Sequence, residues 1–288
     1  MSVTPKEVTR SAIVEIARDY YNSEDADYFY SQIWGGEDIH VGLYANTNEA
    51  ISEASHRTVV TLAQRLPKLD ADCHVLDMGS GYCGAARYLA KTYGAHITAL
   101  NLSEVENQRA RELNAAAGLA SYIEVHDGSF EMMPFASASS SEVGFDIVWS
   151  QDAILHSGNR QQVLAEAFRV LKSGGHFVWT DPMQADNCPE GVLQPILDRI
   201  HLNSLGSPIY YRTVAEKLGF EVLDFDDQSD QLVNHYQRVL EETEARTVEL
   251  EKKVDASYVE RMKAGLKHWI AGGKAGHLAW GIFLFRKP

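Results

Sequence analysis

A strand-like run, a glycine-rich turn and a helix-like run follow one another from Val75 to Gly94, in the segment VLDMGSGYCGAARYLAKTYG. Gly79, Gly81 and Gly84 are spaced as G-x-G-x-x-G, which allows a tight turn and close approach of the backbone to a ligand. This order of elements predicts the first βα unit of an open, doubly wound sheet. A nucleotide-like ligand is expected above the turn.

Strand-like and helix-like runs alternate along the rest of the chain. Seven strand-like runs follow residue 70, and helical segments of about 10–15 residues separate the first five. This alternation is typical of βαβ units, so we expect an α/β fold with a Rossmann-like, seven-stranded, mostly parallel sheet. Gly174 and Gly175 are expected to end the helix before the fifth strand. The last run, from Leu278, is the longest and is expected at the edge of the sheet. The runs begin at Cys73, His96, Tyr122, Phe145, His176, Phe220 and Leu278.

The segments outside this alternation are predicted to be helical. Residues 1–69 form the predicted N-terminal cap, and residues 70–288 form the core, with insertions at about 183–219 and 229–276. Within the cap, apolar spacing predicts a helix over 51–66, after two short aromatic-rich helices or a helix and a loop. Because ligands of such sheets bind beyond the carboxyl ends of the strands, we expect the cap and insertions to cover that edge. The second insertion carries two apolar stripes, one of Leu232, Tyr236, Val239 and Leu240, the other of Val259, Met262, Leu266 and Trp269.

Composition and charge exclude several classes of protein. The chain has 26 Lys and Arg against 40 Asp and Glu, a net charge of −14, and no basic block with interleaved aromatics, so nucleic acid is a poor partner. No apolar run approaches the roughly 20 residues that cross a bilayer, and the first 21 residues lack the apolar stretch of a signal peptide. Three scattered cysteines indicate free thiols in a reducing compartment. We therefore expect a cytoplasmic protein, and the charged C-terminal helices would permit a homodimer.

The carboxylate of Asp77, directly before the glycine turn, discriminates between ligands. A dinucleotide would place its anionic pyrophosphate on the turn, where this carboxylate would repel it. S-adenosylmethionine has no phosphate and carries a sulfonium and an ammonium, both of which favour a negative neighbour. Asp77 therefore favours S-adenosylmethionine. The alternative is that Asp77 caps the helix or bonds to amides of the turn, in a dinucleotide site or in no site.

Polar residues at the ends of the later strands extend this site. Asn101 is placed to bind a ribose hydroxyl, and the segment HDGSF offers Asp127 and the following amides to the adenine rim, with Phe130 near its face. Asp127 as a simple turn former is the alternative. The expected donor contacts are Asp77, Gly79, Gly81, Asn101, Leu102, Asp127, Gly128, Ser129, Phe130, Ser150 and Gln151.

Longer motifs then identify a family. VLDMGSG, NLSE, FDIVWSQD and VLKSGGHFVWTDP resemble the successive motifs of class I S-adenosylmethionine-dependent methyltransferases. ARDYYNSEDADYFYSQIWGGEDIHVGLY, DPMQADNCPEGVLQPILDRIHL and HWIAGGKAGHLAWGIFLFRK resemble the sarcosine/dimethylglycine N-methyltransferases that make the osmolyte glycine betaine, so the resemblance covers nearly the whole chain. It implies S-adenosylmethionine as donor, S-adenosylhomocysteine as product, and the methylation of sarcosine to dimethylglycine and of dimethylglycine to glycine betaine. The alternatives are a methyltransferase for another small amine such as phosphoethanolamine or glycine, an NAD-binding oxidoreductase, or a binding protein without turnover.

A second resemblance concerns catalysis. SQDAILH is similar to the phosphoethanolamine methyltransferases, in which this histidine and a tyrosine of the cap close over the donor. Carried onto this chain, the pair is Tyr21 and His156, with Tyr30 as a second cap aromatic. His156 is also the best candidate for a proton acceptor, because histidine titrates near neutrality. The alternatives are a satisfied helix histidine or a contact that only closes the cap. Two departures are Asn101, where the wider superfamily has Asp or Glu, and Cys83, where glycine is frequent.

A small zwitterionic substrate requires two opposite charges to be recognised. For the carboxylate we expect Arg212, with Arg199 and Arg57 as further candidates and a surface ion pair as the alternative for each. For the cationic nitrogen we expect Asp152 to orient the ammonium; the alternative is that Asp152 caps the N-terminus of a helix. Aromatic faces bind such cations too, and we expect Tyr21 and then Tyr211 here. The further aromatic candidates, which could equally be core residues, are Trp34, Trp149, Tyr210 and Trp280. No H-x-x-x-H or histidine–carboxylate cluster is present, so no metal is predicted.

Overall fold

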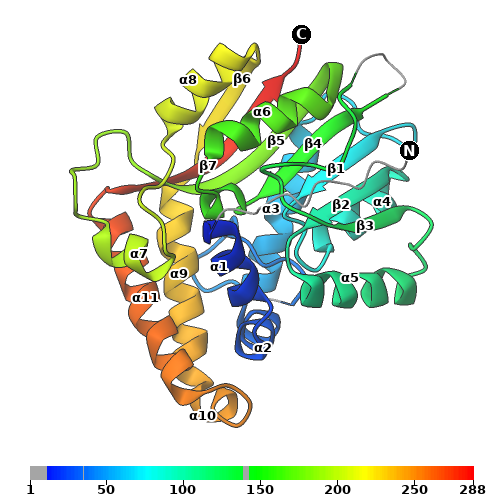
Figure 1. Ribbon diagram of the computed structural model, residues 1–288. Helices are drawn as coiled ribbons and strands as arrows, with labels where there is room; N and C mark the ends of the chain where they lie inside the picture. Colours follow the sequence, from blue (N-terminus) through cyan, green and yellow to red (C-terminus); the bar gives the residue numbers. More distant parts are fainter. Residues whose placement is uncertain (1–11, 35, 139–142) are drawn as a thin grey trace, which may run out of the picture.

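A seven-stranded sheet forms the centre of the protein. The computed structural model describes residues 12–34, 36–138 and 143–288. The strand order is β3-β2-β1-β4-β5-β7-β6, with β1 to β5 parallel and β7 antiparallel to both of its neighbours (Figure 1). The strands are β1 His74–Met78, β2 His96–Asn101, β3 Ile123–Asp127, β4 Phe145–Gln151, β5 Leu171–Gln184, β6 Glu221–Asp227 and β7 Leu278–Arg286. The α/β, class I type of sheet that the sequence predicts is confirmed.

Helices cover both faces of the sheet. Along each strand, successive side chains point to opposite faces, so that Leu76 and Phe177 face one layer while Val75 and Val178 face the other. The first layer contains α6 (Arg160–Val170) and α8 (Pro208–Leu218), and the second contains α3 (Ile51–Arg65) and α4 (Gly84–Tyr93). Burial of apolar side chains on both faces explains why the parallel strands read as continuous apolar runs.

Four further helices gather beyond the carboxyl ends of the strands. Here α1 (Ala12–Tyr21) and α2 (Glu24–Ile33) lie beside a long antiparallel pair, α9 (Ser229–Ala245) and α11 (Ala256–Lys274), as Figure 1 shows. Phe29 and Trp34 pack with Tyr236 and Trp269 in one apolar cluster, and both predicted stripes of the second insertion are buried in it. The other helices are α5 Glu104–Ala116, the 3-10 turn η1 Ile154–His156, α7 Gln194–Arg199 and α10 Thr247–Leu250.

Two local predictions are wrong. The last strand, β7, is not an edge strand, because β6 pairs with its free side, and seven of its nine residues are buried. The glycine pair does not end a helix either: α6 ends at Val170, and Gly174 and Gly175 lie within β5. A Cβ at Gly175 would lie 2.9 Å from the carbonyl oxygen of Asp146 on β4, so the pair is needed where the strands approach closely at a register shift.

Other predictions concern the ends and divisions of the chain. The lead-in before α1 that the sequence predicts, residues 1–11, lies outside the described residues. The predicted boundary at residue 69, between the cap and the core, stays a prediction. The helix α3 belongs to the predicted cap but packs on the sheet. Within the part of the chain that the structure describes, no helix combines the length and apolarity needed to span a membrane, and no three His, Cys, Asp or Glu residues are grouped to bind a metal.

Candidate active site

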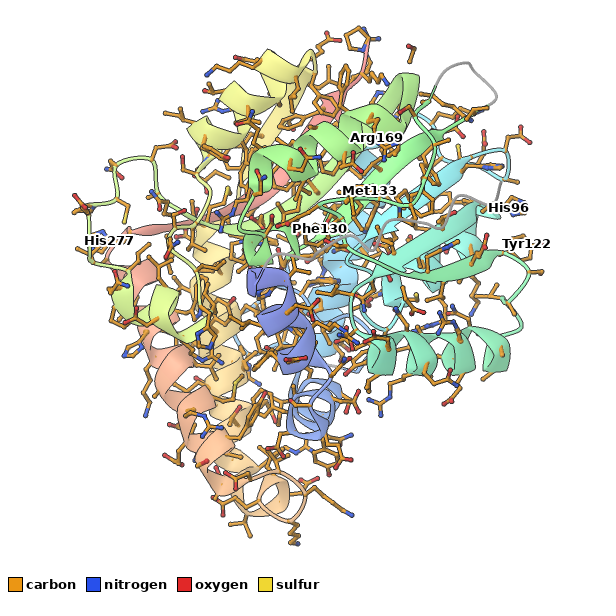
Figure 2. All side chains as sticks on the ribbon, in the orientation of Figure 1. His96, Tyr122, Phe130, Met133, Arg169 and His277 are labelled. Atoms are coloured by element: carbon orange, nitrogen blue, oxygen red, sulfur yellow. The ribbon has the colours of Figure 1, made fainter. Side chains whose placement is uncertain are left out.

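A cavity lies at the carboxyl ends of β1 to β4, beneath the N-terminal helices. Its floor comes from the sheet edge, and its cover comes from Val14 and Tyr21 of α1 and from Ile39 of the loop that follows α2. Phe130, just after β3, lines this cavity and lies near the middle of Figure 2, whereas His96 and Tyr122 mark the opposite ends of the strands. The predicted contact residues that line it are Tyr21, Gly79, Gly81, Asn101, Leu102, Gly128, Ser129, Phe130, Gln151, Asp152 and His156. A smaller adjoining cavity is lined by Asp77 and shares Ile39, Gly79, Gly81 and Gln151 with the first.

The glycine turn lines the cavity and packs closely against its protein neighbours. Gly79 and Gly81 have φ angles of +75° and +49°, in the left-handed region that side chains disfavour. A Cβ at Gly79 would collide with the Cβ of Ala153, and one at Gly81 would lie 3.2 Å from Cδ1 of Ile39. The two glycines therefore allow the turn to lie directly against Ala153, two residues after β4, and against Ile39 of the cap loop.

Asp77 is a buried carboxylate with no hydrogen-bond partner among the described residues. Its residue is 3% exposed, and no described residue donates a hydrogen bond to its side chain. The amides of Gly79 and Ser80 donate to the carbonyl of Leu100 instead, so the alternative in which Asp77 bonds to turn amides is wrong. Burial, and then the nearby charge of Asp38, raise the pKa of Asp77 to about 7. Two carboxylates converge on one small cavity, which is the arrangement that binds a cation.

The cap carboxylate, Asp38, is a site residue that the sequence analysis missed. Its Oδ1 is buried without a hydrogen-bond partner among the described residues, while Oδ2 lies 3.2 Å from Nδ1 of His56. It reaches Asp77 from a loop 39 positions earlier in the sequence, and no local pattern signals that approach.

The second missed residue is Glu106, which lines the cavity beside Asn101. Asn101 Nδ2 donates to Glu106 Oε2 at 2.8 Å, and burial raises the pKa of Glu106 to about 7. Glu106 is the third residue after the N-cap Ser103, the spacing of a capping box. A capping-box glutamate normally reaches back to the backbone of the N-cap residue, but here it bonds to Asn101 at the end of β2. Asn101 and Glu106 together offer polar groups to ribose hydroxyls.

Two of the expected donor contacts do not reach the cavity. The Asp127 carboxylate accepts from Asn107 Nδ2 at 2.6 Å and pairs with Arg111 at 3.2 Å on the surface. The hydroxyl of Ser150 donates to the carbonyl of Met78 at 2.8 Å, inside the sheet between β1 and β4. Their positions at strand ends are as predicted, but their side chains point away from the ligand space.

Tyr21 and His156 meet across the cavity. The Tyr21 hydroxyl lies 2.8 Å from Nε2 of His156, so one hydrogen bond joins the end of α1 to η1. Burial, and then the charges of Arg160 and Arg199, lower the pKa of His156 to about 4. The expectation that His156 titrates near neutrality is therefore wrong. Burial also raises the pKa of Tyr21 well above 10, so the pair is neutral and the hydroxyl keeps its proton.

Asp152 ties the cavity to three other parts of the fold. Its Oδ2 accepts from the backbone amide of Val41 at 2.6 Å, and its Oδ1 accepts from Thr180 Oγ1 at 2.8 Å and Trp280 Nε1 at 2.7 Å. These donors belong to the cap loop, β5 and β7. Asp152 itself has φ +51° at the end of β4 and caps no helix. Its carboxylate is held in one orientation at the cavity wall.

The remaining substrate candidates lie elsewhere. Tyr30 is in the cap, with its hydroxyl 3.2 Å from that of Tyr20, and does not line the cavity. The prediction for Tyr211 is wrong: the side chain is fully buried on the inner face of α8, and its hydroxyl donates to Asp181 Oδ2 at 2.6 Å. Arg212 is also wrong, because its Nε donates to the carbonyl of Pro208 within the same helix. Arg57 forms an ion pair with Glu49 and does not line the cavity.

The other aromatic candidates are accounted for by packing. Trp149 and Trp280 are completely buried in the sheet, and Trp34 is 6% exposed and donates from Nε1 to the carbonyl of His40. Tyr210 is 40% exposed on the surface of α8. None of the four lines the cavity between the cap and the sheet.

Comparisons with known proteins agree with this geometry. The methyltransferase domain family matches residues 76–179. The chain is 54% identical over 277 residues to sarcosine/dimethylglycine N-methyltransferase of Aphanothece halophytica, covering 96% of this chain and 98% of that protein. It is 56% identical over 274 residues to the enzyme of the same name from Halorhodospira halochloris, covering 95% and 96%. A solved structure assigned as a sarcosine dimethylglycine methyltransferase from Galdieria sulphuraria has a TM-score of 0.87 and 44% identity, covering 93% and 98%. The chain therefore belongs to the sarcosine/dimethylglycine N-methyltransferase family.

Proposed function

We propose that the protein methylates the nitrogen of sarcosine to give dimethylglycine, and that of dimethylglycine to give glycine betaine. Its methyl donor is S-adenosylmethionine. The observation that carries the proposal is identity above 50% to two enzymes of that name over at least 95% of this chain, which includes most of the cap. The prediction of an N-methyltransferase made from the motifs is confirmed, and the NAD-dependent alternative is wrong.

The cavity fits the donor on its own evidence. When bound, S-adenosylmethionine supplies a methyl group activated by its positive sulfonium. The unpartnered carboxylate of Asp77, with Asp38, would bind the ammonium of the donor, because a buried anion needs a cation beside it. Asn101 and Glu106 would bind the ribose hydroxyls, and Phe130 would lie against the adenine. These roles are proposals that rest on the lining of the cavity.

The chain contributes alignment rather than acid–base chemistry. A direct displacement mainly requires that the nucleophile and the methyl group be held in line. Because the pKa of His156 is about 4, its ring is a poor acceptor for the proton of an ammonium ion, so we assign the Tyr21–His156 contact to closing the cap. The site then selects the minor neutral form of the amine. Asp152, held by three donors, would orient the positive charge that grows on the nitrogen.

Replacing Tyr21 by Phe tests the closing contact. Loss of one hydrogen bond between α1 and η1 should lower kcat by about 10- to 100-fold, a loss of the size that misplacing the reacting groups produces. The affinity for S-adenosylmethionine should change by less than about 3-fold, since Tyr21 is one of many residues that line the cavity. Steady-state rates and calorimetric binding measure the two effects separately. Tyr28→Phe, on the cap but absent from the cavity lining, is the matched control. Wild-type turnover in Tyr21→Phe would remove the proposed role.

A substrate panel tests the function itself. The purified protein is incubated with S-adenosylmethionine and with sarcosine, dimethylglycine, glycine or phosphoethanolamine in turn, and the products are identified by mass. Dimethylglycine is expected from sarcosine and glycine betaine from dimethylglycine. Turnover of phosphoethanolamine, with no glycine betaine formed, would assign the protein to the alternative substrate class.

Three further predictions accompany this proposal. The first is a cytoplasmic protein with no nucleic-acid or membrane partner. The second is a homodimer, and the third is a division into a cap at residues 1–69 and a core at 70–288. Within the chain, α9 and α11 pack on each other through Tyr236 and Trp269, whose rings lie 5.2 Å apart. A homodimer would therefore use the outer faces of this pair, and its presence is measured by light scattering.

A further inference from the structure

Arg199, the last residue of α7, has a guanidinium without a carboxylate partner among the described residues. Its side chain hydrogen-bonds from Nη2 to Met262 Sδ at 2.7 Å, and a thioether is a weak acceptor. The neighbouring carboxylate of Asp198 accepts from Gln194 instead. By contrast, Arg57 pairs with Glu49. Arg199 is partly buried, so its charge is an uncompensated one beside the apolar cluster of the cap.

The position of this guanidinium is set by α11. A Cβ at Gly265 would lie 2.7 Å from Cζ of Arg199, so the guanidinium rests directly on the backbone of that helix. Met262 lies one turn earlier on α11, and its sulfur also accepts from the hydroxyl of Tyr20 at 3.6 Å. The guanidinium of Arg199 and the hydroxyl of Tyr20 therefore meet at one sulfur atom, at the junction of α1, α7 and α11.

The charge of Arg199 acts on the residues that close the donor cavity. Burial is the main cause of the high pKa values of Tyr21 and Tyr30. The positive charge of Arg199 acts in the opposite direction and lowers the pKa of both tyrosines. Burial, Arg160 and then Arg199 lower the pKa of His156. Arg199 does not line the donor cavity, but both Tyr21 and His156 do. Arg199 is thus a positive charge that acts on both members of the Tyr21–His156 pair from outside the cavity lining.

We infer that Arg199 binds the carboxylate of the amino-acid substrate. The inference rests on the proposed function and names the residue that makes it selective for amino acids. In sarcosine and dimethylglycine one methylene separates the nitrogen from the carboxylate, so the carboxylate must lie next to the place of methyl transfer. An arginine binds a carboxylate through two parallel N–H···O bonds, which replace the single contact with the Met262 sulfur. Asp152 at the cavity wall and Arg199 behind it then match the two ends of the zwitterion.

The test compares dimethylglycine with its neutral amide, N,N-dimethylglycinamide, in the full-length enzyme. Both present a tertiary amine, and only the acid can pair with a guanidinium. Arg199→Gln should lower the ratio of kcat/KM for acid over amide by about 100-fold, the size of a lost charge-assisted contact, chiefly through KM for dimethylglycine. The Kd for S-adenosylmethionine should stay within about 3-fold of wild type, since Arg199 does not line that cavity. Arg212→Gln, a neighbouring arginine bonded within its own helix, is the matched control and should leave the ratio unchanged.

A second variant keeps the charge and moves it. Gly265→Ala places a methyl group where the guanidinium rests, and should lower the acid-to-amide ratio by about 10-fold without removing a cation. If Arg199→Gln does not fold, as judged by thermal unfolding, Arg199→Lys and Gly265→Ala decide the question. An equal loss for acid and amide, or no loss for either, overturns the inference. Failure of the proposed function would appear differently, as absence of glycine betaine with the wild-type enzyme before any variant is made.

Discussion

Asp77→Asn is expected to lower the affinity for S-adenosylmethionine by about 10- to 100-fold while leaving the fold intact. The carboxylate is buried and has no hydrogen-bond donor among the described residues, so none of them stabilises its charge by a hydrogen bond in the ligand-free protein. When the donor ammonium lies beside it, the pair forms in a site shielded from water, where a charge-assisted contact contributes about 1.5–3 kcal/mol. Asparagine keeps the shape of the side chain and removes this contribution.

The same substitution should stabilise the ligand-free protein above neutral pH. The pKa of Asp77 in the folded protein is about 7, above its ordinary value of 3.8, so the folded state binds this proton more tightly than the unfolded state. The stability contributed by the protonated form is present below pH 4 and is lost as the pH rises to about 7. At pH 8 the ionised carboxylate then costs at most about 4 kcal/mol, which asparagine avoids.

Calorimetry and thermal unfolding measure both effects between pH 6 and pH 9. For the wild type, donor affinity should rise as the pH is raised from 6 to about 7, because the ammonium binds the ionised carboxylate. In Asp77→Asn this rise should be smaller, with Glu106 as the remaining group that titrates in the cavity. Glu112→Gln, an exposed acid on α5, makes the same change in net charge and should change neither property. Equal affinities for wild type and Asp77→Asn would rule out the ammonium contact.

Asp152→Ala is expected to destabilise the protein by about 3–5 kcal/mol and to abolish measurable methyl transfer. Removal of the carboxylate leaves the amide of Val41, the hydroxyl of Thr180 and the indole of Trp280 without their acceptor in a buried place, and such losses are among the largest that single substitutions cause. The cap loop also loses its attachment to the end of β4. Substrate orientation and cap position should therefore be lost together.

Urea unfolding of the ligand-free protein measures the first effect, and product analysis by mass measures the second. Asp152→Asn should be intermediate, because its amide oxygen can still accept while its NH₂ group faces the N–H of Val41 or the donors on the other side. Glu216→Ala, exposed on α8, should cost no more than about 0.5 kcal/mol. If Asp152→Ala is as stable as this control, the carboxylate does not tie the cap to the sheet.

The parts of the molecule that could be predicted from sequence are those with a local signal. Alternating runs gave the seven strands because apolar periodicity is a property of neighbouring residues, and the carboxylate at Asp77 could be interpreted because it directly precedes the glycine turn. The position of β7 between β5 and β6 could not, since strand order depends on contacts between distant segments. For the same reason Asp38, which approaches Asp77 from the cap loop, had no signal in the sequence.

Residue type alone does not fix the role of a side chain that can serve two purposes. Tyr211 could bind a cation through its face or fill a core, and its contacts with Asp181 and with Trp179, whose ring lies 4.6 Å away, show the second use. Glu106 was overlooked because its spacing from Ser103 is already explained as a helix cap. His156 was expected to titrate near neutrality, but burial and then the charges of Arg160 and Arg199 lower its pKa to about 4. In each case the tertiary environment determines the role of the side chain.

The cover of the donor cavity has a consequence for how two methylations follow one another. Val14, Tyr21 and Ile39 line the nucleoside space from the side of the cap, so we expect α1 and the loop after α2 to withdraw when the spent nucleoside leaves. Each withdrawal also frees the amino acid beneath the same helices. Dimethylglycine made from sarcosine therefore re-equilibrates with the surrounding pool before its next methylation. The enzyme should work distributively, so a time course started from sarcosine accumulates free dimethylglycine ahead of glycine betaine.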